Sequence, residues 1–220
     1  MNRTKIIKKE NIERNAYVLT LDKNSERAKF SKNILEKIGF NVILFEAIKD
    51  EFPMRSHRKS MYAIYEKLLE EKEDKYFYVF EDDINTTIDI TLSYLLEYEK
   101  LNENIYYLGC CYNRGKFIKQ NLKINNEILC KIRGGVRGIH SLCMNRKGVE
   151  ILKKIYDDNP KNYHMDVMLE KYTLENPLIV IGRNLKSPCN HGHFGIFYQD
   201  RGKFESQLEN CYYYNLENNK

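Results

Sequence analysis

The stretch Tyr76–Ile84, with the sequence YFYVFEDDI, changes abruptly from apolar residues to three acids. Residues Tyr76–Phe80 are aromatic or β-branched, and these types favour β-strands, so we expect a central strand there. It ends at Glu81-Asp82-Asp83. In open α/β sheets, ligands bind outside the carboxyl ends of the strands. The stretch therefore predicts a central strand with a site at its end.

The sequence before this stretch alternates strand and helix patterns. Short apolar runs at Ala16–Leu21 and Val42–Phe45 predict two strands. Between them, Ser25 can cap a helix that stops at Gly39. A second helix is expected to start at Ser56, because apolar residues then recur at helical spacing: Met61, Ile64, Tyr65, Leu68 and Leu69.

The sequence after the stretch continues this alternation and then becomes less regular. A helix with Leu92, Leu95 and Leu96 and a strand at Ile105–Leu108 come first. Later elements are a hairpin around residues 125–127, a strand at 141–144, a helix capped by Asn145 and a strand at 178–181. Strands alternating with helices favour a mostly parallel sheet with helices on both faces. We predict one α/β domain over residues 1–220.

Composition limits the class of protein. The chain has 220 residues, 42% hydrophobic and 30% charged, which is enough for a domain with its own core. The net charge of +5 is spread along the chain, and the dense basic run is Lys5, Lys8 and Lys9. Nucleic-acid binders concentrate basic residues into a patch or stripe. We therefore expect no nucleic-acid partner.

The absence of recognisable targeting signals and the cysteine usage lead us to expect a cytoplasmic protein. No apolar run approaches the roughly 20 residues that span a bilayer, so no transmembrane segment is expected. Residues 1–15 lack the apolar core of a signal peptide. The six cysteines include no CxxC pair, and a chain of this size does not depend on disulfides. Reduced thiols are expected.

The acidic triplet is the candidate metal site. Neighbouring carboxylates repel one another, and each unit of raised pKa costs about 1.4 kcal/mol. A divalent cation removes this cost, and oxygen ligands suit Mg²⁺ or Mn²⁺. Strand alternation puts Glu81 and Asp83 on the same side, so these two are expected to bind the metal while Asp82 faces away. A solvated acidic turn is the alternative for the triplet alone.

Several stretches resemble, in the same order, the family-25 glycosyltransferases, the group of lipopolysaccharide and collagen galactosyltransferases. YFYVFEDDI resembles their VLEDD-type motif. The other similar stretches, over roughly residues 15–185, are Tyr17–Arg27 (a VINLDRxxxR pattern), Phe40–Asp50, Ser56–Leu69 (LSHxxxW), Gly138–Gly148 (GTHAYxISRKGA) and His164–Met168 around Asp166 (PVDxxL).

The resemblance implies a GT-A fold, a nucleotide-sugar donor and an inverting transfer. Residues 15–108 would then form a nucleotide-binding half and residues 109–220 an acceptor-side half. The loop after the first strand, with Thr20, Leu21 and Asp22, can lie against a base and ribose, and Arg27 can reach a phosphate. An ordinary capping loop with an exposed arginine is the alternative.

Ser56 and His57 lie at the expected start of a helix. Free N–H groups and the helix dipole favour an anion there, such as a diphosphate. Arg55, Arg58 and Lys59 add positive charge. The alternative is simple capping by Ser56. We group Ser56 and His57, together with Asp82, with the residues that bind the nucleotide sugar.

Two residues of the second half are candidates for the transfer step. Inverting transfer needs a carboxylate that takes the proton of the acceptor hydroxyl, and Asp166 is our candidate general base. Its alternative role is a carboxylate that interacts with a helix dipole. His140 follows a glycine-rich segment and could contact the donor sugar or the acceptor. A hydrogen-bonded structural histidine is the alternative.

The tail contains a Cys189-x-His191-x-His193 cluster. A closed zinc site needs four ligands, and no second Cys/His pair stands at the required spacing. In several GT-A enzymes a C-terminal histidine completes the metal site, and we favour His193 over His191 for this role. Solvated loop histidines are the alternative. The tail also departs from the family-25 pattern, which leaves the acceptor undefined.

The leading hypothesis is a hexosyltransferase that uses Mn²⁺ or Mg²⁺ and a UDP-linked donor, UDP-glucose or UDP-galactose. The acceptor would be a glycan or a hydroxylated side chain. One alternative is a catalytically inactive module that binds sugar nucleotides or glycans. Another is a metal-dependent nucleotidyl-handling enzyme, although residues 20–23 contain no phosphate-binding glycine. The 17 tyrosines, including Tyr212–Tyr214, are compatible with a homodimer or with binding to glycan faces.

Overall fold

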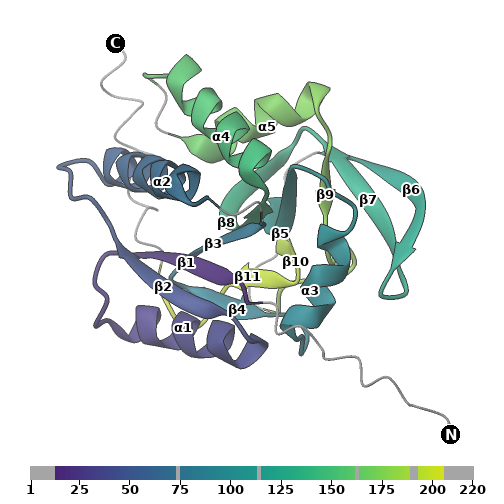
Figure 1. Cartoon of the computed structure of the whole chain (residues 1–220), viewed down its shortest axis with the longest axis horizontal. Helices are drawn as coiled ribbons and strands as arrows, with labels where there is room; N and C mark the ends of the chain where they lie inside the picture. The colour runs from purple at the N-terminus through teal and green to yellow at the C-terminus, as the bar shows by residue number, and fades with distance from the viewer. Residues whose placement is uncertain (1–12, 73–74, 113–114, 162–163, 189–192, 206–220) are drawn as a thin grey trace, which may run out of the picture.

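The computed structural model describes residues 13–72, 75–112, 115–161, 164–188 and 193–205 (Figure 1). The strands are β1 (Asn15–Thr20), β2 (Asn41–Glu46), β3 (Phe77–Glu81), β4 (Ile84–Thr86), β5 (Ile105–Tyr112), β6 (Lys116–Ile124), β7 (Glu127–Arg133), β8 (Val136–Met144), β9 (Leu178–Val180), β10 (His193–Gly195) and β11 (Phe197–Gln199). The helices are α1 (Glu26–Ile38), α2 (Pro53–Glu70), α3 (Leu92–Glu99), α4 (Arg146–Asp158) and α5 (Met165–Glu175).

One large sheet joins both halves of the described chain. Its strand order is β2-β1-β3-β8-β5-β9-β7-β6, and β10 pairs with β5. Strands β2, β1, β3, β5, β9 and β6 run in one direction, whereas β8, β7 and β10 run in the other. The parallel part, β2-β1-β3, brings three carboxyl ends to one edge of the sheet.

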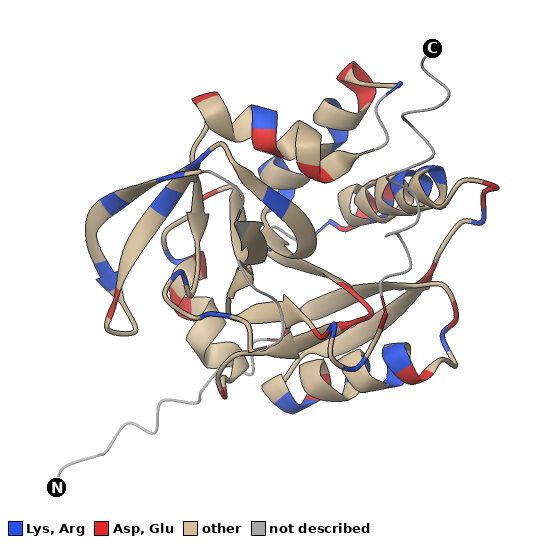
Figure 2. Cartoon of the chain, turned by 180° about the vertical axis from the view of Figure 1, so that it is seen from behind, with Lys and Arg blue, Asp and Glu red and all other residues tan. Residues whose placement is uncertain are grey.

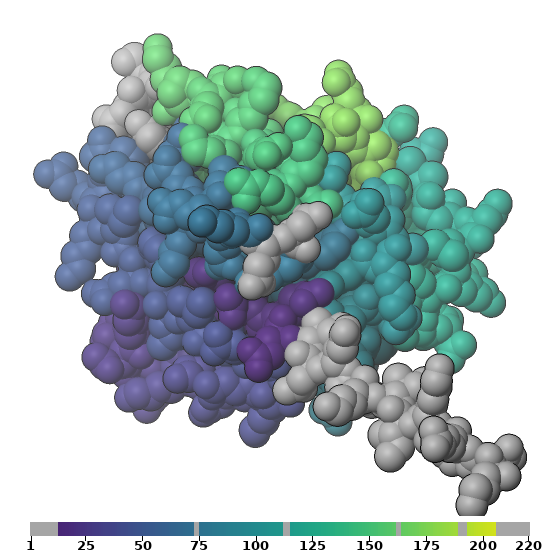
Figure 3. Space-filling view, viewed as in Figure 1, coloured from purple at the N-terminus to yellow at the C-terminus, as the bar shows by residue number. Residues whose placement is uncertain are grey.

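Helices cover both faces of this sheet. In β1, Tyr17 and Leu19 belong to the core cluster that also contains buried residues of α2, α4 and α5, whereas Ala16 and Val18 belong to the cluster with α1 and α3. Figure 1 shows these two helical layers on opposite sides of the sheet, and α4 packs beside α2 (Figure 3). A strand buried on both faces has continuous apolar sequence. The predicted α/β class is confirmed.

The predicted helix starts are correct at two helices and wrong at one. Ser25 caps α1 by accepting from Ala28 N at 3.1 Å, and Asn145 caps α4. Helix α2, however, begins at Pro53 rather than at Ser56. Proline is well suited to the first helical position, because it has no N–H that needs a partner there.

The last described elements were not predicted. The sequence indicated an irregular tail, but β11 pairs with β4, which directly follows the acidic triplet, and β10 pairs with β5. Gly109 allows this close approach, because a Cβ atom there would lie 1.9 Å from the carbonyl oxygen of Phe197. The end of the described chain is therefore docked against the end of β3.

The described surface carries interspersed acidic and basic segments, with lysines and arginine on the β6–β7 hairpin (Figure 2). That hairpin turns at Asn125 and Asn126, whose φ values of 50° and 64° suit a two-residue turn. Cys110, Cys111, Cys130 and Cys143 carry free thiols. Of the described helices, none is long and apolar enough to cross a membrane.

Candidate functional site

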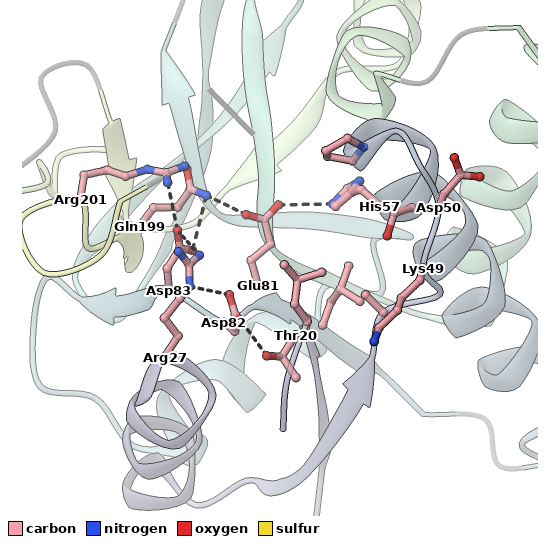
Figure 4. A pocket seen from close by; sticks show the side chains of 15 residues that line it. Thr20, Arg27, Lys49, Asp50, His57, Glu81, Asp82, Asp83, Gln199 and Arg201 are labelled. Atoms are coloured by element: carbon pink, nitrogen blue, oxygen red, sulfur yellow. Dashed lines mark hydrogen bonds and ion pairs between the residues drawn. The ribbon is translucent and has the colours of Figure 1, made fainter. Parts of the chain in front are cut away.

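A cavity of about 350 Å³ opens at the carboxyl ends of β1, β2 and β3 (Figure 4). It lies where the parallel strands were expected to place a ligand. Its wall comes from the first half of the chain and from the segment after β10. The lining residues are Leu19, Thr20, Leu21, Arg27, Ala47, Lys49, Asp50, Pro53, Ser56, His57, Glu81, Asp82, Asp83, Gln199 and Arg201.

The cavity brings together most of the residues singled out in the first half of the sequence. Its wall includes these: Thr20, Leu21, Arg27, Ser56, His57, Glu81, Asp82 and Asp83. Asp22 is not among the lining residues. Its carboxylate accepts from Asn24 N at 2.8 Å, so it orders the turn before α1.

The three acids of the triplet have different partners. Gln199 Nε2 donates to Glu81 Oε2 at 2.7 Å and lies 3.5 Å from Asp83 Oδ1, so these two carboxylates converge on one amide. Asp82 instead accepts from Thr20 Oγ1 at 2.6 Å and from Arg27 Nε at 3.0 Å. The chain thus directs Asp82 toward β1 and α1 and Glu81 toward β11, whereas Asp83 lies between β11 and Arg27 of α1.

Asp83 is a buried acid between two cations. Its side chain is 1% exposed, and its Oδ2 lies 3.0 Å from Arg27 Nη2 and 3.3 Å from Arg201 Nη1. Burial and the nearby Glu81 carboxylate raise the pKa of Asp83 to about 6, even though the two arginines act to lower it. The negative charge of the site is therefore incompletely balanced.

Glu81 holds its charge more firmly than Asp83. Burial acts to raise the pKa of Glu81, but His57, His140 and Arg201 lower it to about 2. His57 Nε2 lies 3.5 Å from Glu81 Oε1. At neutral pH, Glu81 is the permanent anion of the pair, and the pKa of Asp83 is raised partly because Glu81 stays charged.

The expected anion site at the N–H groups of Ser56 is not formed. Because α2 begins at Pro53, Ser56 N already donates to the carbonyl oxygen of Phe52 at 3.0 Å. Its hydroxyl does not cap the helix but donates to the carbonyl oxygen of Ile48 at 2.8 Å. Ser56 thereby fixes the loop between β2 and α2. Ser56 and His57 line the cavity, but the N–H group of Ser56 is not free to bind an anion there.

The basic residues around Ser56 are already paired. Arg55 Nε and Lys59 Nζ lie 2.8 and 2.6 Å from Asp50, and Lys59 and Arg55 hold the pKa of Asp50 below its usual range. Arg58 donates to the carbonyl oxygen of Asn159 at 2.8 Å and so links α2 to α4. The uncompensated positive charge expected here is therefore reduced.

The predicted trio of metal ligands is not assembled. Across the described ranges, no group of three or more His, Cys, Asp or Glu side chains is arranged to hold a metal ion. The ring of His193 contacts Cys111 Sγ, with Nε2 at 3.0 Å, because β10 pairs with β5 rather than with β3. His191 lies outside the described residues. The carboxylates of Glu81 and Asp83 are what the described site offers a cation.

His140 and Asp166 lie outside the cavity wall. His140 is buried on β8, its Nε2 is 3.4 Å from the carbonyl oxygen of Phe197, and its ring stacks on His193. Asp166 is half-buried in the first turn of α5. Burial, together with the Glu81 and Asp166 carboxylates, raises the pKa of Cys111 to about 12. The charges of both carboxylates therefore act on the same interior thiol.

Sequence reasoning missed Gln199 and Arg201. Both come from the tail and extend toward the triplet (Figure 4). The backbone fixes their place: Asp200 N donates to the carbonyl oxygen of Asp83 at 2.7 Å, and β11 pairs with β4. The short sequence Phe197–Gln199 gives no local signal of this long-range pairing.

Comparisons with known proteins concern the fold. No protein-family model and no curated protein matches the chain. One similar solved structure is a glycosyltransferase involved in glycosylation of the major capsid of PBCV-1, with 12% identity, 68% of each chain covered and a TM-score of 0.43. A CTP:phosphocholine cytidylyltransferase from Streptococcus pneumoniae has 13% identity, covers 93% of this chain and 99% of its own, and has a TM-score of 0.47. A UDP-glucose pyrophosphorylase complexed with UDP-glucose has 14% identity, covers 76% of this chain and 71% of its own, and has a TM-score of 0.40.

Proposed function

We propose that this chain is a glycosyltransferase that transfers a hexose from a nucleotide-sugar donor, with a UDP-linked sugar as our first choice. The observation that carries the proposal is the composition of the cavity. Carboxylates and guanidinium groups meet on one wall, Glu81 and Asp83 against Arg27 and Arg201, at the carboxyl ends of parallel strands. A diphosphate needs such cations, and a cation bound to it needs such carboxylates.

The other wall of the cavity suits a nucleoside. It is formed by Leu19, Leu21, Ala47 and Pro53, and the side chain of Leu21 is half exposed. Pockets for small molecules combine an apolar surface with a few convergent polar groups. We infer that the base and ribose lie against this apolar wall and that the diphosphate points toward Arg27 and Arg201.

Glu81 and Asp83 are our proposed ligands for Mn²⁺ or Mg²⁺. The fit is supported by two facts: both carboxylates approach the same Gln199 amide, and Asp83 Oδ2 accepts no hydrogen bond from a described residue. Phosphate oxygens would complete the shell, as is usual where Mg²⁺ is bound by one or two carboxylates. Such an ion stabilises the negative charge on a leaving diphosphate.

Asp166 is our proposed general base. In the transfer, an acceptor hydroxyl oxygen forms a bond to the anomeric carbon, the bond from that carbon to the diphosphate oxygen breaks, and the carboxylate takes the hydroxyl proton. Support comes from the match of residues 164–168 to the PVDxxL element and from the half-buried position of Asp166 in the first turn of α5. The acceptor, a glycan or a hydroxylated side chain, would approach from the side of α5.

A donor assay tests the proposal. Purified protein is incubated with UDP-glucose, UDP-galactose and their N-acetyl forms, with and without Mn²⁺, and released UDP is measured. We expect Mn²⁺-dependent UDP release by the wild-type protein and a loss of at least about 100-fold in Asp83→Ala, in the range typical of removing a group that stabilises transition-state charge. Full activity of Asp83→Ala would exclude its metal role. Turnover of a nucleoside triphosphate with a sugar phosphate instead would favour nucleotidyl transfer.

The role of Asp166 has its own test. Asp166→Asn keeps the shape of the side chain and removes its basicity. We expect kcat to fall by about 100- to 10,000-fold, as is typical for loss of general acid–base catalysis, with donor affinity unchanged because Asp166 does not line the cavity. An equal loss of donor affinity would instead indicate a structural role.

A further inference from the structure

The guanidinium group of Arg201 faces an unusual partner. Its Nη1 lies 3.3 Å from Asp83 Oδ2, and Arg27 Nη2 lies 3.0 Å from the same oxygen. That oxygen is buried, yet it accepts no hydrogen bond from a described residue. Arginine–carboxylate pairs are strong when two aligned hydrogen bonds form. Here two cations share one oxygen without such alignment, which makes the pairing easy to exchange.

The two arginines differ in how they are held. Arg27 donates from Nε to Asp82 at 3.0 Å and from Nη1 to the carbonyl oxygen of Glu205 at 2.7 Å, and it lies over the ring of Phe204. Within the described ranges, Asp83 is the one carboxylate at ion-pair distance from Arg201. Arg27 is therefore held by several described groups, whereas the described contact of the Arg201 guanidinium is with Asp83, and both side chains line the cavity (Figure 4).

The charge balance shows what would move Arg201. At the triplet, three carboxylates stand against the guanidinium groups of Arg27 and Arg201, and the cavity wall also contains Lys49, Asp50 and His57. A diphosphate in the cavity adds more negative charge and attracts Arg201, which is the triplet cation held by fewer described contacts. When Arg201 leaves Asp83, that carboxylate loses a neighbouring positive charge and therefore attracts a divalent cation more strongly. Without a nucleotide, Arg201 stays beside Asp83 and opposes cation binding.

We propose that Arg201 moves from Asp83 to the diphosphate of the bound nucleotide and thereby couples nucleotide binding to divalent-cation binding. The inference rests on the proposed function, since it requires a nucleoside diphosphate in the cavity. The coupling is reciprocal: the factor by which the nucleotide raises cation affinity equals the factor by which the cation raises nucleotide affinity. Coupling of this kind is typically about 5- to 150-fold.

Isothermal titration calorimetry on the full chain tests the exchange. Each of UDP and Mn²⁺ is titrated alone and in the presence of the other, with wild-type protein, Arg201→Gln and the charge-matched control Lys203→Gln. Lys203 is exposed and contacts the ring of Phe30 rather than the triplet. For Arg201→Gln we expect about tenfold weaker UDP binding, the loss typical of one charged hydrogen bond. We also expect tighter Mn²⁺ binding without UDP and a coupling factor close to one.

The opposite signs of these two effects make the test specific. A variant that weakens UDP binding but leaves Mn²⁺ binding without UDP unchanged or weaker overturns the exchange, because Arg201 would then be a phosphate ligand only. Arg201→Lys keeps the positive charge but not the planar fork of donors. It is the second variant in case Arg201→Gln does not fold, and its coupling factor must fall below that of the wild type. If wild-type protein binds none of UDP, GDP, CDP or ADP, the proposed function itself fails.

Discussion

Replacing Asp83 by Asn should stabilise the protein at neutral pH when no nucleotide or metal is bound. Asp83 is buried, and burial together with the Glu81 carboxylate raises its pKa from 3.8 to about 6. The folded protein therefore holds a charge that its surroundings disfavour. Asparagine has nearly the same shape without the charge, so the change removes this unfavourable contribution and keeps the packing.

The size and the pH window follow from linkage. A carboxyl group with a raised folded pKa contributes its full stability below the unfolded value of 3.8 and loses it as pH rises toward about 6. The shift of roughly two units corresponds to about 3 kcal/mol at most. The stability of the wild-type protein should therefore fall relative to Asp83→Asn between about pH 4 and pH 6, and the difference should stay constant above that range.

Thermal unfolding at pH 4 and at pH 7.5, in buffer containing EDTA and no phosphate, measures the effect. Because 1 kcal/mol shifts Tm by about 2–4 °C in a chain of this size, a rise of several degrees is expected at pH 7.5 and little change at pH 4. The exposed Asp89, changed to Asn, is the control. A difference that does not depend on pH, or a less stable Asp83→Asn, would refute the electrostatic reasoning.

Three further outcomes follow from the same contacts. Gly109→Ala should lower stability by about 1–3 kcal/mol and weaken UDP binding, because its Cβ would displace Phe197 and so β11; normal UDP affinity in calorimetry would contradict this. Ser25→Ala should cost about 1 kcal/mol in denaturant unfolding, since it removes the α1 cap, whereas an unchanged midpoint would not fit. His193→Ala should leave Mn²⁺ affinity unchanged, because the ring contacts Cys111; weaker binding would restore His193 as a ligand.

The sequence was most informative where local and long-range signals agree. The first strand, the α1 helix with its Ser25 cap, and the strand that ends at Glu81 all have apolar patterns that match their burial. The position of parallel carboxyl ends then placed Thr20, Arg27 and the triplet in one cavity. Element type and the N-terminal wall of the site were therefore predictable.

The remaining parts depend on contacts between distant residues. Helix α2 starts at Pro53, one turn before Ser56; because proline favours the first helical position, this start was predictable from the local sequence, unlike the contacts that follow. Gln199 and Arg201 belong to the site because β11 pairs with β4, and a strand of three residues carries too little sequence to indicate its partner. The same reason applies to His193, whose strand pairs with β5 instead of approaching the acids.

The docking of β11 also determines when, during synthesis, Gln199 and Arg201 can join the cavity. Gln199 follows Glu81 by 118 residues, yet the two share a hydrogen bond. A growing chain can form the β2-β1-β3 edge early, but the acidic triplet then lacks one of its two guanidinium groups. Residues 199 and 201 leave the ribosome only after the whole β2-β1-β3 region, because synthesis runs from the N-terminus. A ribosome-bound chain that has not yet exposed residues 197–205 would thus carry an acidic cavity that lacks Gln199 and Arg201.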